Sequence, residues 1–467
     1  MEHGRERLSE VKPVSDCEFE TLLEGVDPAL ASAPPSVFLA GVSGGADSMA
    51  LCLMLACWCR THGHRLIAVT VDHGLRSDSA AEAGRVAAWM AARGIEHETL
   101  SWRGVKPATG LQAAARSARF TLLIDRAASL GAAGLFLAHH MEDQAETMAM
   151  RLARGSGPDG LAGIRSRQIR DGVPVLRPLL PLLPERLQAH CLTEGQVWID
   201  DPSNRDTRFE RVRIRLQAKE MRESGLGASD LDRLAQAFGR LRDWSETRLT
   251  SFLIEAGDLD PRGFAAIDLS AVFGLLPPLR AKLFSGLLQS IGGLDYPPRA
   301  ERMQRFLRWL DDGADDRVTL GGCLVWRGRA DRLWIARETP REIGRKVLCG
   351  QQLSRWDGRF DVTWAGAQPA WIHMLTRKGE RRLRLTGTVG GSFTVMPASV
   401  RASLPAVTDL DGRLFAPHFP DTWTSQRPLE ADLFHIEFRP AVPWVADAFR
   451  ASRDDRVATN DYEWASG

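Results

Sequence analysis

The chain has 467 residues, and its 44% hydrophobic and 25% charged residues exclude a collagen-like or wholly disordered protein. At roughly 150 residues per domain, this length predicts about three domains. The longest apolar run, Met49–Trp58, is about half the ~20 residues of a membrane span. No apolar signal core follows the first residues, and seven scattered cysteines do not suit a secreted disulfide framework. We therefore expect a soluble, cytoplasmic protein, whose net charge of +1 neither supports nor excludes a nucleic-acid partner.

The first half of the chain predicts a flexible arm followed by an α/β domain. Residues 1–35 are polar and contain proline, as is typical of an arm. Between residues 36 and 216, apolar strands alternate with helical patterns, which predicts βαβ units and a parallel sheet. The expected strands are Val37–Leu39, Leu66–Val71, Glu98–Trp102, Gly134–Ala138 and Val197–Ile199. The expected helices are Asp47–Arg60, Ala80–Arg93, Leu111–Leu130 and Glu142–Arg154.

The second half predicts two further domains. Over residues 217–316 apolar residues recur at helical spacing, for example Leu231, Leu234, Phe238 and Leu241, which indicates a helical middle domain. Residues 317–467 consist of short β-like segments separated by glycine and proline. This pattern predicts a small, mainly β C-terminal domain.

A glycine-rich turn joins the first expected strand to the first expected helix. Its residues are Ser43, Gly44, Gly45, Ala46, Asp47 and Ser48. Glycine lets a ligand approach the backbone, and the free N–H groups of the following helix bind anions. Because Asp47 repels phosphate unless a divalent cation lies between them, the turn indicates a magnesium-bound nucleotide. Two alternatives are an ordinary tight turn with Asp47 as helix cap and a Gly-x-Ser-x-Gly nucleophile elbow with Ser43 as nucleophile.

Charged side chains recur at helical spacing further along this domain. Arg116 and Arg119 are three residues apart on one expected helix, so both can reach the same site. His139, Asp143 and Glu146 are spaced to share one helix face. Paired carboxylates beside a phosphate loop suit a cation, either magnesium or the ammonium group of a substrate. In each case the alternative is a solvated helix face.

These segments, in this order, resemble the tRNA(Ile)-lysidine synthetase family of the PP-loop ATP pyrophosphatase superfamily. The resemblance covers residues 36–216, and residues 396–413 are similar to the family's C-terminal domain. It rests on residues 41–48, 71–76, 112–120, 138–147, 154–161, 176–180 and 200–215. This chain departs from the family at Glu142, where an aspartate is usual, and at Val212, where asparagine is frequent.

The resemblance implies an enzyme that binds ATP and Mg²⁺ and acts on tRNA(Ile) with a CAU anticodon. Such an enzyme joins L-lysine to carbon 2 of the wobble cytidine through an adenylated cytidine and releases AMP and pyrophosphate. The two later domains would then bind tRNA, with a candidate basic patch in the C-terminal domain whose alternative is a solvated face. The patch comprises Arg377, Lys378, Arg381, Arg382 and Arg384. The oligomeric state is open, with a homodimer as one alternative.

The resemblance also implies roles for individual residues. The ATP phosphates would lie on residues 43–48 and the metal on Asp47 and Asp143. Asp143 and Glu146 would hold the lysine ammonium group, and Arg116 and Arg119 the α-phosphate or the lysine carboxylate. His140 or His139 is the candidate general base.

Three other functions are open on the sequence. A tRNA thiolase usually has paired cysteines, whereas Cys57 and Cys59 lie inside an apolar helical pattern. An amidotransferase of the GMP synthetase kind needs a glutaminase module, for which no cysteine motif is present. A nucleotide-binding module without catalysis has no need of Asp47, Asp143 and Glu146.

Overall fold

The computed structural model divides the chain into two compact units, residues 1–243 and 244–467. We treat each unit by itself. The structure describes residues 8, 10–75, 78–104, 106–107, 109–200, 227–313, 316–339, 344–350, 353–366, 368–385, 393, 396–418, 434–440, 442 and 444–449. Among them, no helix is both long and apolar enough to span a membrane.

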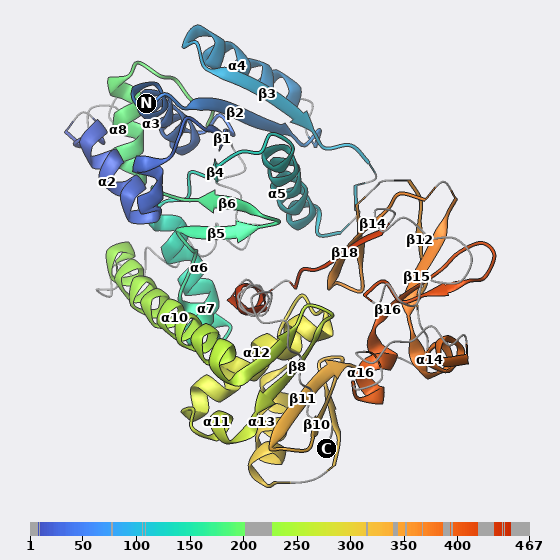
Figure 1. The fold of residues 1–467 in the computed structure, drawn as a ribbon. Coiled ribbons are helices and arrows are strands. Elements are labelled where there is room, and N and C mark those ends of the chain that lie inside the picture. Colours follow the sequence, from blue (N-terminus) through green and yellow to red (C-terminus); the bar gives the residue numbers. More distant parts are fainter. Residues whose placement is uncertain are drawn as a thin grey trace. The chain divides into compact units, whose positions relative to one another are not determined.

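A six-stranded sheet forms the core of the first unit, in the order β3-β2-β1-β4-β6-β5 (Figure 1). Its strands are β1 Val37–Gly41, β2 Arg65–Asp72, β3 Glu96–Ser101, β4 Gly134–Phe136, β5 Arg167–Arg170 and β6 Val173–Leu176. Five strands run parallel, and only the edge strand β5 is antiparallel to its neighbour. The predicted parallel α/β fold is therefore confirmed.

Helices cover both faces of this sheet. They are α2 Asp16–Val26, α3 Ala46–His62, α4 Ser79–Ala92, α5 Leu111–Ser129, α6 Met141–Ala153, α7 Pro158–Leu161 and α8 Pro184–Thr193, with the 3-10 helix η1 Pro28–Ser32. Successive residues of β1 face opposite layers: Phe38 packs in the core beneath α3 and α8, and Leu39 in the core beneath α5. Because both faces of β1 are buried, a shift of one residue would exchange the two sets of side chains, so this alternation fixes the register of β1 with its neighbours.

Two expectations for this unit differ from the structure. Residues 197–199 form no strand, and the remaining strands are instead the hairpin β5–β6. Within the expected arm, residues 16–26 fold as α2, because Ser15 caps its first turn and Phe19 and Leu23 are buried in the core.

The second unit combines helices with three antiparallel sheets. Its helices are the C-terminal part of α10 Ala228–Ala256, then α11 Leu269–Phe273, α12 Pro277–Gly292, α13 Ala300–Asp311, α14 Thr376–Leu385 and α16 Ala398–Ser403. The strand orders are β7-β8-β11-β10-β9, β12-β15-β16-β17 and β13-β14-β18. The prediction that the C-terminal region consists mainly of β-strands is confirmed.

These strands have the following bounds: β7 Gly257–Asp260, β8 Phe264–Asp268, β9 Val318–Leu320, β10 Cys323–Arg327, β11 Arg332–Arg337, β12 Lys346–Leu348, β13 Ser354–Trp356, β14 Phe360–Trp364, β15 Ala370–Met374, β16 Pro405–Thr408, β17 Leu414–Phe415 and β18 Phe434–Phe438. The expected helical stretch 217–316 includes β7 and β8, which the sequence analysis did not predict. β8 pairs with β11, so residues 264–268 belong to a sheet that continues beyond residue 316.

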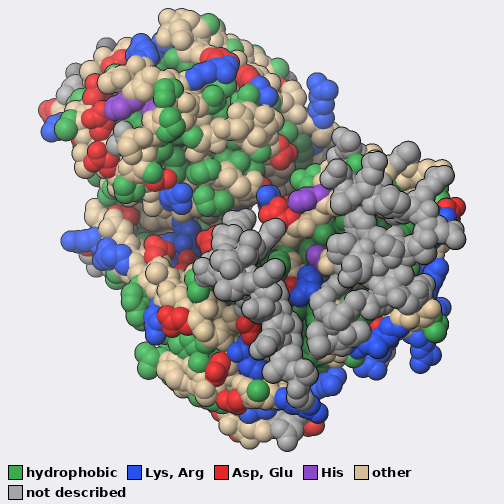
Figure 2. Space-filling view, viewed as in Figure 1, with side chains coloured by type: hydrophobic (Ala, Val, Ile, Leu, Met, Phe, Trp, Pro, Cys, Tyr) green, Lys and Arg blue, Asp and Glu red, His purple; other side chains and the backbone are tan. Residues whose placement is uncertain are grey.

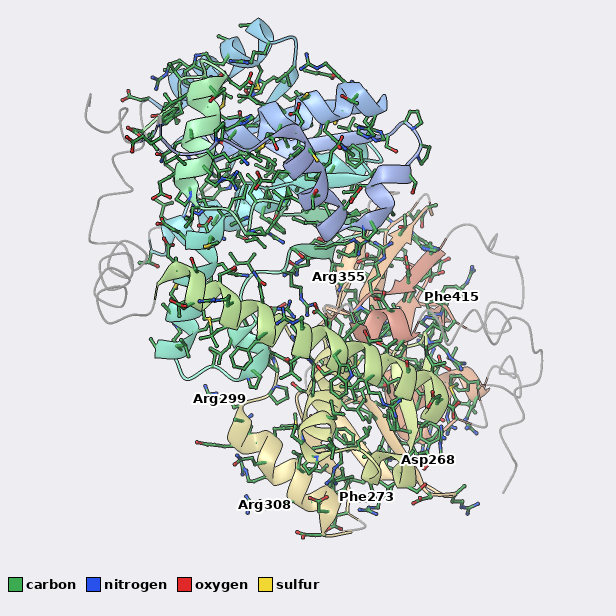
Figure 3. All side chains as sticks on the ribbon, turned by 90° about the vertical axis from the view of Figure 1, so that its left-hand side faces the viewer. Asp268, Phe273, Arg299, Arg308, Arg355 and Phe415 are labelled. Carbon is green, nitrogen blue, oxygen red and sulfur yellow. The ribbon has the colours of Figure 1, made fainter. Side chains whose placement is uncertain are left out.

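The surface of this unit carries two basic helices. Figure 2 shows Lys and Arg side chains gathered over α14. Its five basic residues are all exposed, while Glu380 and Leu383 are buried on its inner side. On α13, Arg299 and Arg308 mark the two ends of a row of exposed arginines (Figure 3). The row comprises Arg299, Arg302, Arg305 and Arg308.

Candidate active site

The glycine-rich turn between β1 and α3 is shaped by close backbone packing. Gly44 has a φ of +88°, a region that side chains other than glycine rarely adopt. A Cβ atom at Gly44 would lie 2.8 Å from Cδ1 of Ile199 and 2.9 Å from Cγ2 of Val86. The Gly44 carbonyl also accepts a 2.9 Å hydrogen bond from the Ile199 N–H. Gly44 is therefore required by the shape of the turn.

The two serines of the turn bind each other. The Ser48 hydroxyl accepts a hydrogen bond from the Ser43 N–H at 3.1 Å and donates one to the Gly45 carbonyl at 2.9 Å. Their hydroxyl oxygens are 3.1 Å apart. In the part of the chain that the structure describes, no histidine hydrogen-bonds to Ser43, so the nucleophile-elbow alternative has no general base beside its serine.

His140 is the N-cap of α6, at the end of the neighbouring strand β4. Its Nδ1 accepts the Glu142 N–H at 3.2 Å, while the Asp143 carboxylate accepts the His140 N–H at 3.1 Å. These two bonds form a reciprocal capping box. Because Nδ1 accepts a hydrogen bond, Nε2 carries the hydrogen of the neutral ring.

The His140 ring brings two carboxylates from different elements together. Its Nε2 lies 3.6 Å from Oδ2 of Asp47, in the first turn of α3, and 3.7 Å from Oδ2 of Asp143. Asp47 and Asp143 thus flank one imidazole at the carboxyl ends of β1 and β4. Two carboxylates beside a phosphate loop are the oxygen donors that Mg²⁺ prefers, so this donor set fits the ion. No cluster of three or more His, Cys, Asp or Glu side chains suited to a metal occurs among the described residues.

Glu146 and His139 complete the polar cluster around α6. Glu146 is buried, on the second turn of the helix. His139 precedes the helix, so it does not share a helix face with Asp143 as expected, although Asp143 lies close enough to influence its pKa. Burial, reinforced by Arg177, Arg116 and Arg119, lowers the pKa of His139 to about 3. His139 is therefore neutral at physiological pH.

Arginines supply the positive side of the site. Arg116 and Arg119 lie on α5, the first exposed and the second half-buried, and the charge of each lowers the pKa of His139. The sequence analysis counted residues 176–180 toward the family resemblance but gave no role to Arg177, which follows β6 and is only 6% exposed. Burial, together with Arg116 and Arg170, lowers its pKa to about 10. The sequence signal that could have indicated Arg177 is its position as a charged residue directly after the apolar segment Val173–Leu176.

Some expected site residues lie outside the described part of the chain. These are residues 201–215, with their arginines and Val212. The cysteine pair is not a cluster site, since Cys59 is buried, with its pKa raised by burial to about 12, and the Cys57 thiol donates to Asp16. All seven cysteines are free.

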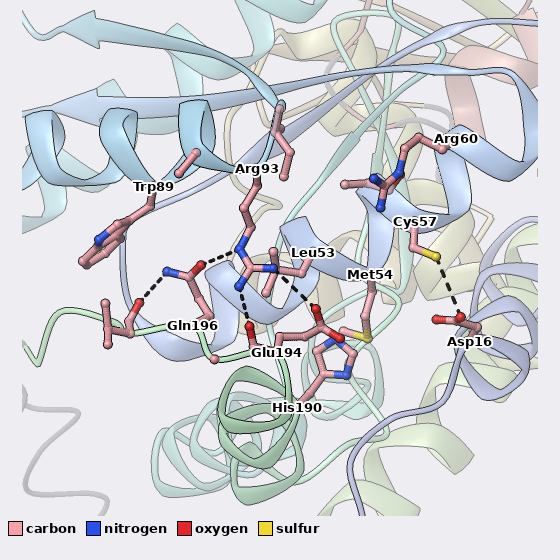
Figure 4. Close-up of a pocket in the computed structure, with 15 residues that line it drawn as sticks. Asp16, Leu53, Met54, Cys57, Arg60, Trp89, Arg93, His190, Glu194 and Gln196 are labelled. Carbon is pink, nitrogen blue, oxygen red and sulfur yellow. Dashed lines mark hydrogen bonds and ion pairs between the residues drawn. The ribbon is translucent and has the colours of Figure 1, made fainter.

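A cavity of about 700 Å³ lies elsewhere in this unit, between the C-terminal parts of α3, α4 and α8 (Figure 4). Leu53, Trp89, Arg93 and Gln196 contribute to its walls. Arg93 donates to the Gln196 side chain at 3.0 Å and also binds Glu194. Residues 43–48 are not among its lining residues, so the cavity is separate from the phosphate turn.

Comparison with known proteins identifies the class to which this fold and site belong. The PP-loop domain family matches residues 19–220, which include the phosphate turn, α6 and Arg177. The first unit is thus a PP-loop ATP-binding domain.

Matches over a greater length of the chain define the family more closely. The tRNA(Ile)-lysidine synthase of Ruegeria pomeroyi is 37% identical over 70% of this chain and 76% of that protein. Those of Rhodopseudomonas palustris and Bradyrhizobium diazoefficiens are 38% and 37% identical, over 66% and 75% of this chain and 92% and 94% of theirs. The chain belongs to the tRNA(Ile)-lysidine synthase family, whose members are ligases. The resemblance seen in the sequence is confirmed.

Proposed function

We propose that this protein joins L-lysine to carbon 2 of the wobble cytidine in the CAU anticodon of tRNA(Ile). ATP first adenylates the carbonyl oxygen at carbon 2 and pyrophosphate leaves; the lysine side-chain amine then attacks carbon 2 and AMP leaves. The observation that carries the proposal is the convergence of Asp47 and Asp143 on His140, beside a turn shaped for phosphate. Membership of the family supports the choice of substrates.

The first step needs positive charge where the phosphates are. The N–H groups of residues 44–48, at the start of α3, provide it, because the N-terminus of a helix attracts anions. Asp47 and Asp143 would hold Mg²⁺, which when bound neutralises phosphate charge. Arg116 and Arg119 add positive charge near the α-phosphate from α5.

The second step needs a neutral amine. Asp143 and Glu146 bind the lysine ammonium group at the start of α6, and a carboxylate there can accept the proton that the attacking nitrogen loses. His140 is the other candidate base, but its Nδ1 already accepts the Glu142 N–H. We therefore assign to His140 the positioning of the two carboxylates, with Nε2–H directed to them.

The second unit offers surfaces that suit the tRNA backbone. The exposed basic residues of α14 and the arginine row of α13 fit phosphate contacts, which depend on charge and are weakened by salt. We propose that both helices bind tRNA and do not contribute to the chemistry.

The test is transfer of labelled lysine to a tRNA(Ile) transcript with a CAU anticodon, in the presence of Mg²⁺ and with or without ATP. We expect ATP-dependent label in tRNA(Ile) and none in tRNA(Met), which carries the same anticodon bases. ATP-to-AMP conversion stimulated by RNA, without label, would keep the PP-loop chemistry and exclude lysine as the acceptor. Binding of RNA and ATP with no turnover would favour the binding-module alternative.

A further inference from the structure

Arg177 is a buried cation without a counter-ion in the described structure. It follows β6, the strand beside β4, and is 6% exposed. Its Nη1 donates to the Arg165 carbonyl at 2.9 Å and its backbone N–H to the Ser166 carbonyl at 2.8 Å. Nε is buried and has no hydrogen-bond partner in the described regions, and no described carboxylate pairs with the guanidinium. A buried charge left in this state is costly unless a ligand compensates it.

The charged groups in the described structure that act on Arg177 are positive. The residues that act on its charge are Arg116 and Arg170, both arginines. His139, at the end of β4, lies close enough to Arg177 for the guanidinium to affect its pKa. The Nδ1 atom of His139 is also buried, with no partner among the residues described. Each of these two residues, which follow the neighbouring strands β4 and β6, therefore has a buried nitrogen without a partner among the described residues.

An anionic ligand with two oxygens fits this arrangement. A guanidinium binds a carboxylate or a phosphate through paired N–H groups, and a neutral imidazole adds one further hydrogen bond. Both a substrate carboxylate and the α-phosphate have this chemistry. The order of the strands distinguishes them, because the phosphate turn follows β1, the acids of α6 follow β4, and Arg177 follows β6.

We propose that Arg177, assisted by His139, binds the α-carboxylate of lysine while Asp143 and Glu146 bind the ammonium group at its other end. The inference rests on the proposed function. Lysine carries opposite charges several ångströms apart, and neighbouring strand ends of this sheet offer the matching acids and arginine. Arg177 also holds residues 165 and 166 by hydrogen bonds, so a test must separate ligand binding from this structural contact.

The test compares the wild-type protein with Arg177→Gln and Arg177→Lys in the lysine-transfer assay. We expect Arg177→Gln to raise the KM for lysine about tenfold to a hundredfold, because a charge-assisted hydrogen-bonded pair is lost. The KM for ATP and kcat should change less than about threefold. Arg177→Lys should restore part of the affinity. The control is Arg167→Gln, which removes from the same hairpin an exposed guanidinium that pairs with Asp27, and it should leave the KM for lysine unchanged.

A substrate analogue tests the same point without any mutation. Labelled 1,5-diaminopentane has the lysine side chain and amine but no carboxylate. The wild type should prefer lysine to it by about the factor that Arg177→Gln costs, and the variant should no longer distinguish them. A variant in which ATP-dependent adenylation is slowed while the KM for lysine is unchanged would assign the anion site to the α-phosphate and overturn the proposal. An unchanged KM for lysine in a correctly folded Arg177→Gln variant would also overturn the proposal. If the wild type itself transfers no lysine, the proposed function fails instead.

Discussion

The phosphate turn and the cluster at the ends of β4 and β6 are built in different ways. The turn presents backbone N–H groups, and its shape depends on two local facts, the φ of Gly44 and the Ser43–Ser48 hydrogen bonds. The other cluster consists of side chains from α3, α5, α6 and β6. It exists only because the sheet order brings these elements to one edge.

This difference decides what a substitution does. At Gly44 of the turn, an added side chain disturbs the backbone and therefore the fold. In the side-chain cluster, replacing a charged group by its isostere leaves the fold intact and removes the chemistry. The predictions below test this division, from the largest effect to the smallest.

Asp143→Asn should reduce kcat/KM for lysine transfer by roughly 10³-fold, because the amide keeps the capping geometry but loses the negative charge that binds the cation. Binding of tRNA, measured by fluorescence anisotropy, should be unchanged. Asp159→Asn, which removes an exposed carboxylate from the neighbouring helix α7, is the control and should retain activity. Near wild-type turnover in Asp143→Asn would remove Asp143 from the active site.

Gly44→Ala should lower the free energy of unfolding by roughly 1–3 kcal/mol, since the residue would be strained at its φ of +88° and would clash with Ile199 and Val86. Gly45→Ala is the matched change. A Cβ there lies 3.7 Å from the Ser43 hydroxyl, and φ is −72°. It should cost no more than about 1 kcal/mol. Equal losses in chemical denaturation would show that the strain argument is wrong.

His139 should make the fold less stable in acid. The unfolded chain protonates this imidazole below its ordinary pKa of 6.5, whereas the folded protein does so only near pH 3. The free energy of unfolding therefore falls as the pH drops from 6.5 towards 3, by about 1–2 kcal/mol at pH 5. His139→Gln should flatten this dependence in unfolding measured from pH 7 to pH 5, and His435→Gln, an exposed control, should not.

Removing charge from α14 should have the smallest effect. The double variant Arg377→Ala with Arg381→Ala should weaken tRNA binding several-fold and reduce the slope of log affinity against log salt by about two. Lysine transfer at saturating tRNA should be unaffected. Arg329→Ala removes an exposed arginine elsewhere in the same unit and serves as the comparison. If the salt dependence of tRNA binding does not change, the basic face of α14 is exposed to solvent and does not contact tRNA.

Sequence reasoning identified the features that depend on local pattern. Strands β1, β2 and β4, the glycine-rich turn and the acidic residues of α6 were predicted because each is visible in a short segment of the sequence. The hairpin β5–β6 was missed because Arg167–Arg170 is mostly polar and Pro174 interrupts the second strand. The sequence analysis assigned no role to Arg177, because its position next to the end of β4 depends on the pairing of β6 with β4.

The apolar stretch 197–199 shows how such a pattern misleads. Its residues have the composition of a strand, and Ile199 does donate one backbone hydrogen bond, but the acceptor is Gly44 of the turn. Trp198 and Ile199 pack on the core of the first unit. The apolar composition predicted a strand, whereas in the structure Val197 is exposed and Ile199 pairs with the turn through this backbone hydrogen bond.

The contact between Ile199 and Gly44 limits how far the turn can be transplanted. Residues 43–48 look like a portable motif, yet the inner side of the turn rests on Ile199, about 150 residues away, and on Val86 of α4. A graft of these six residues onto another strand–helix junction would lack that backing. A working transplant of the turn would therefore have to include apolar side chains in the places of Ile199 and Val86.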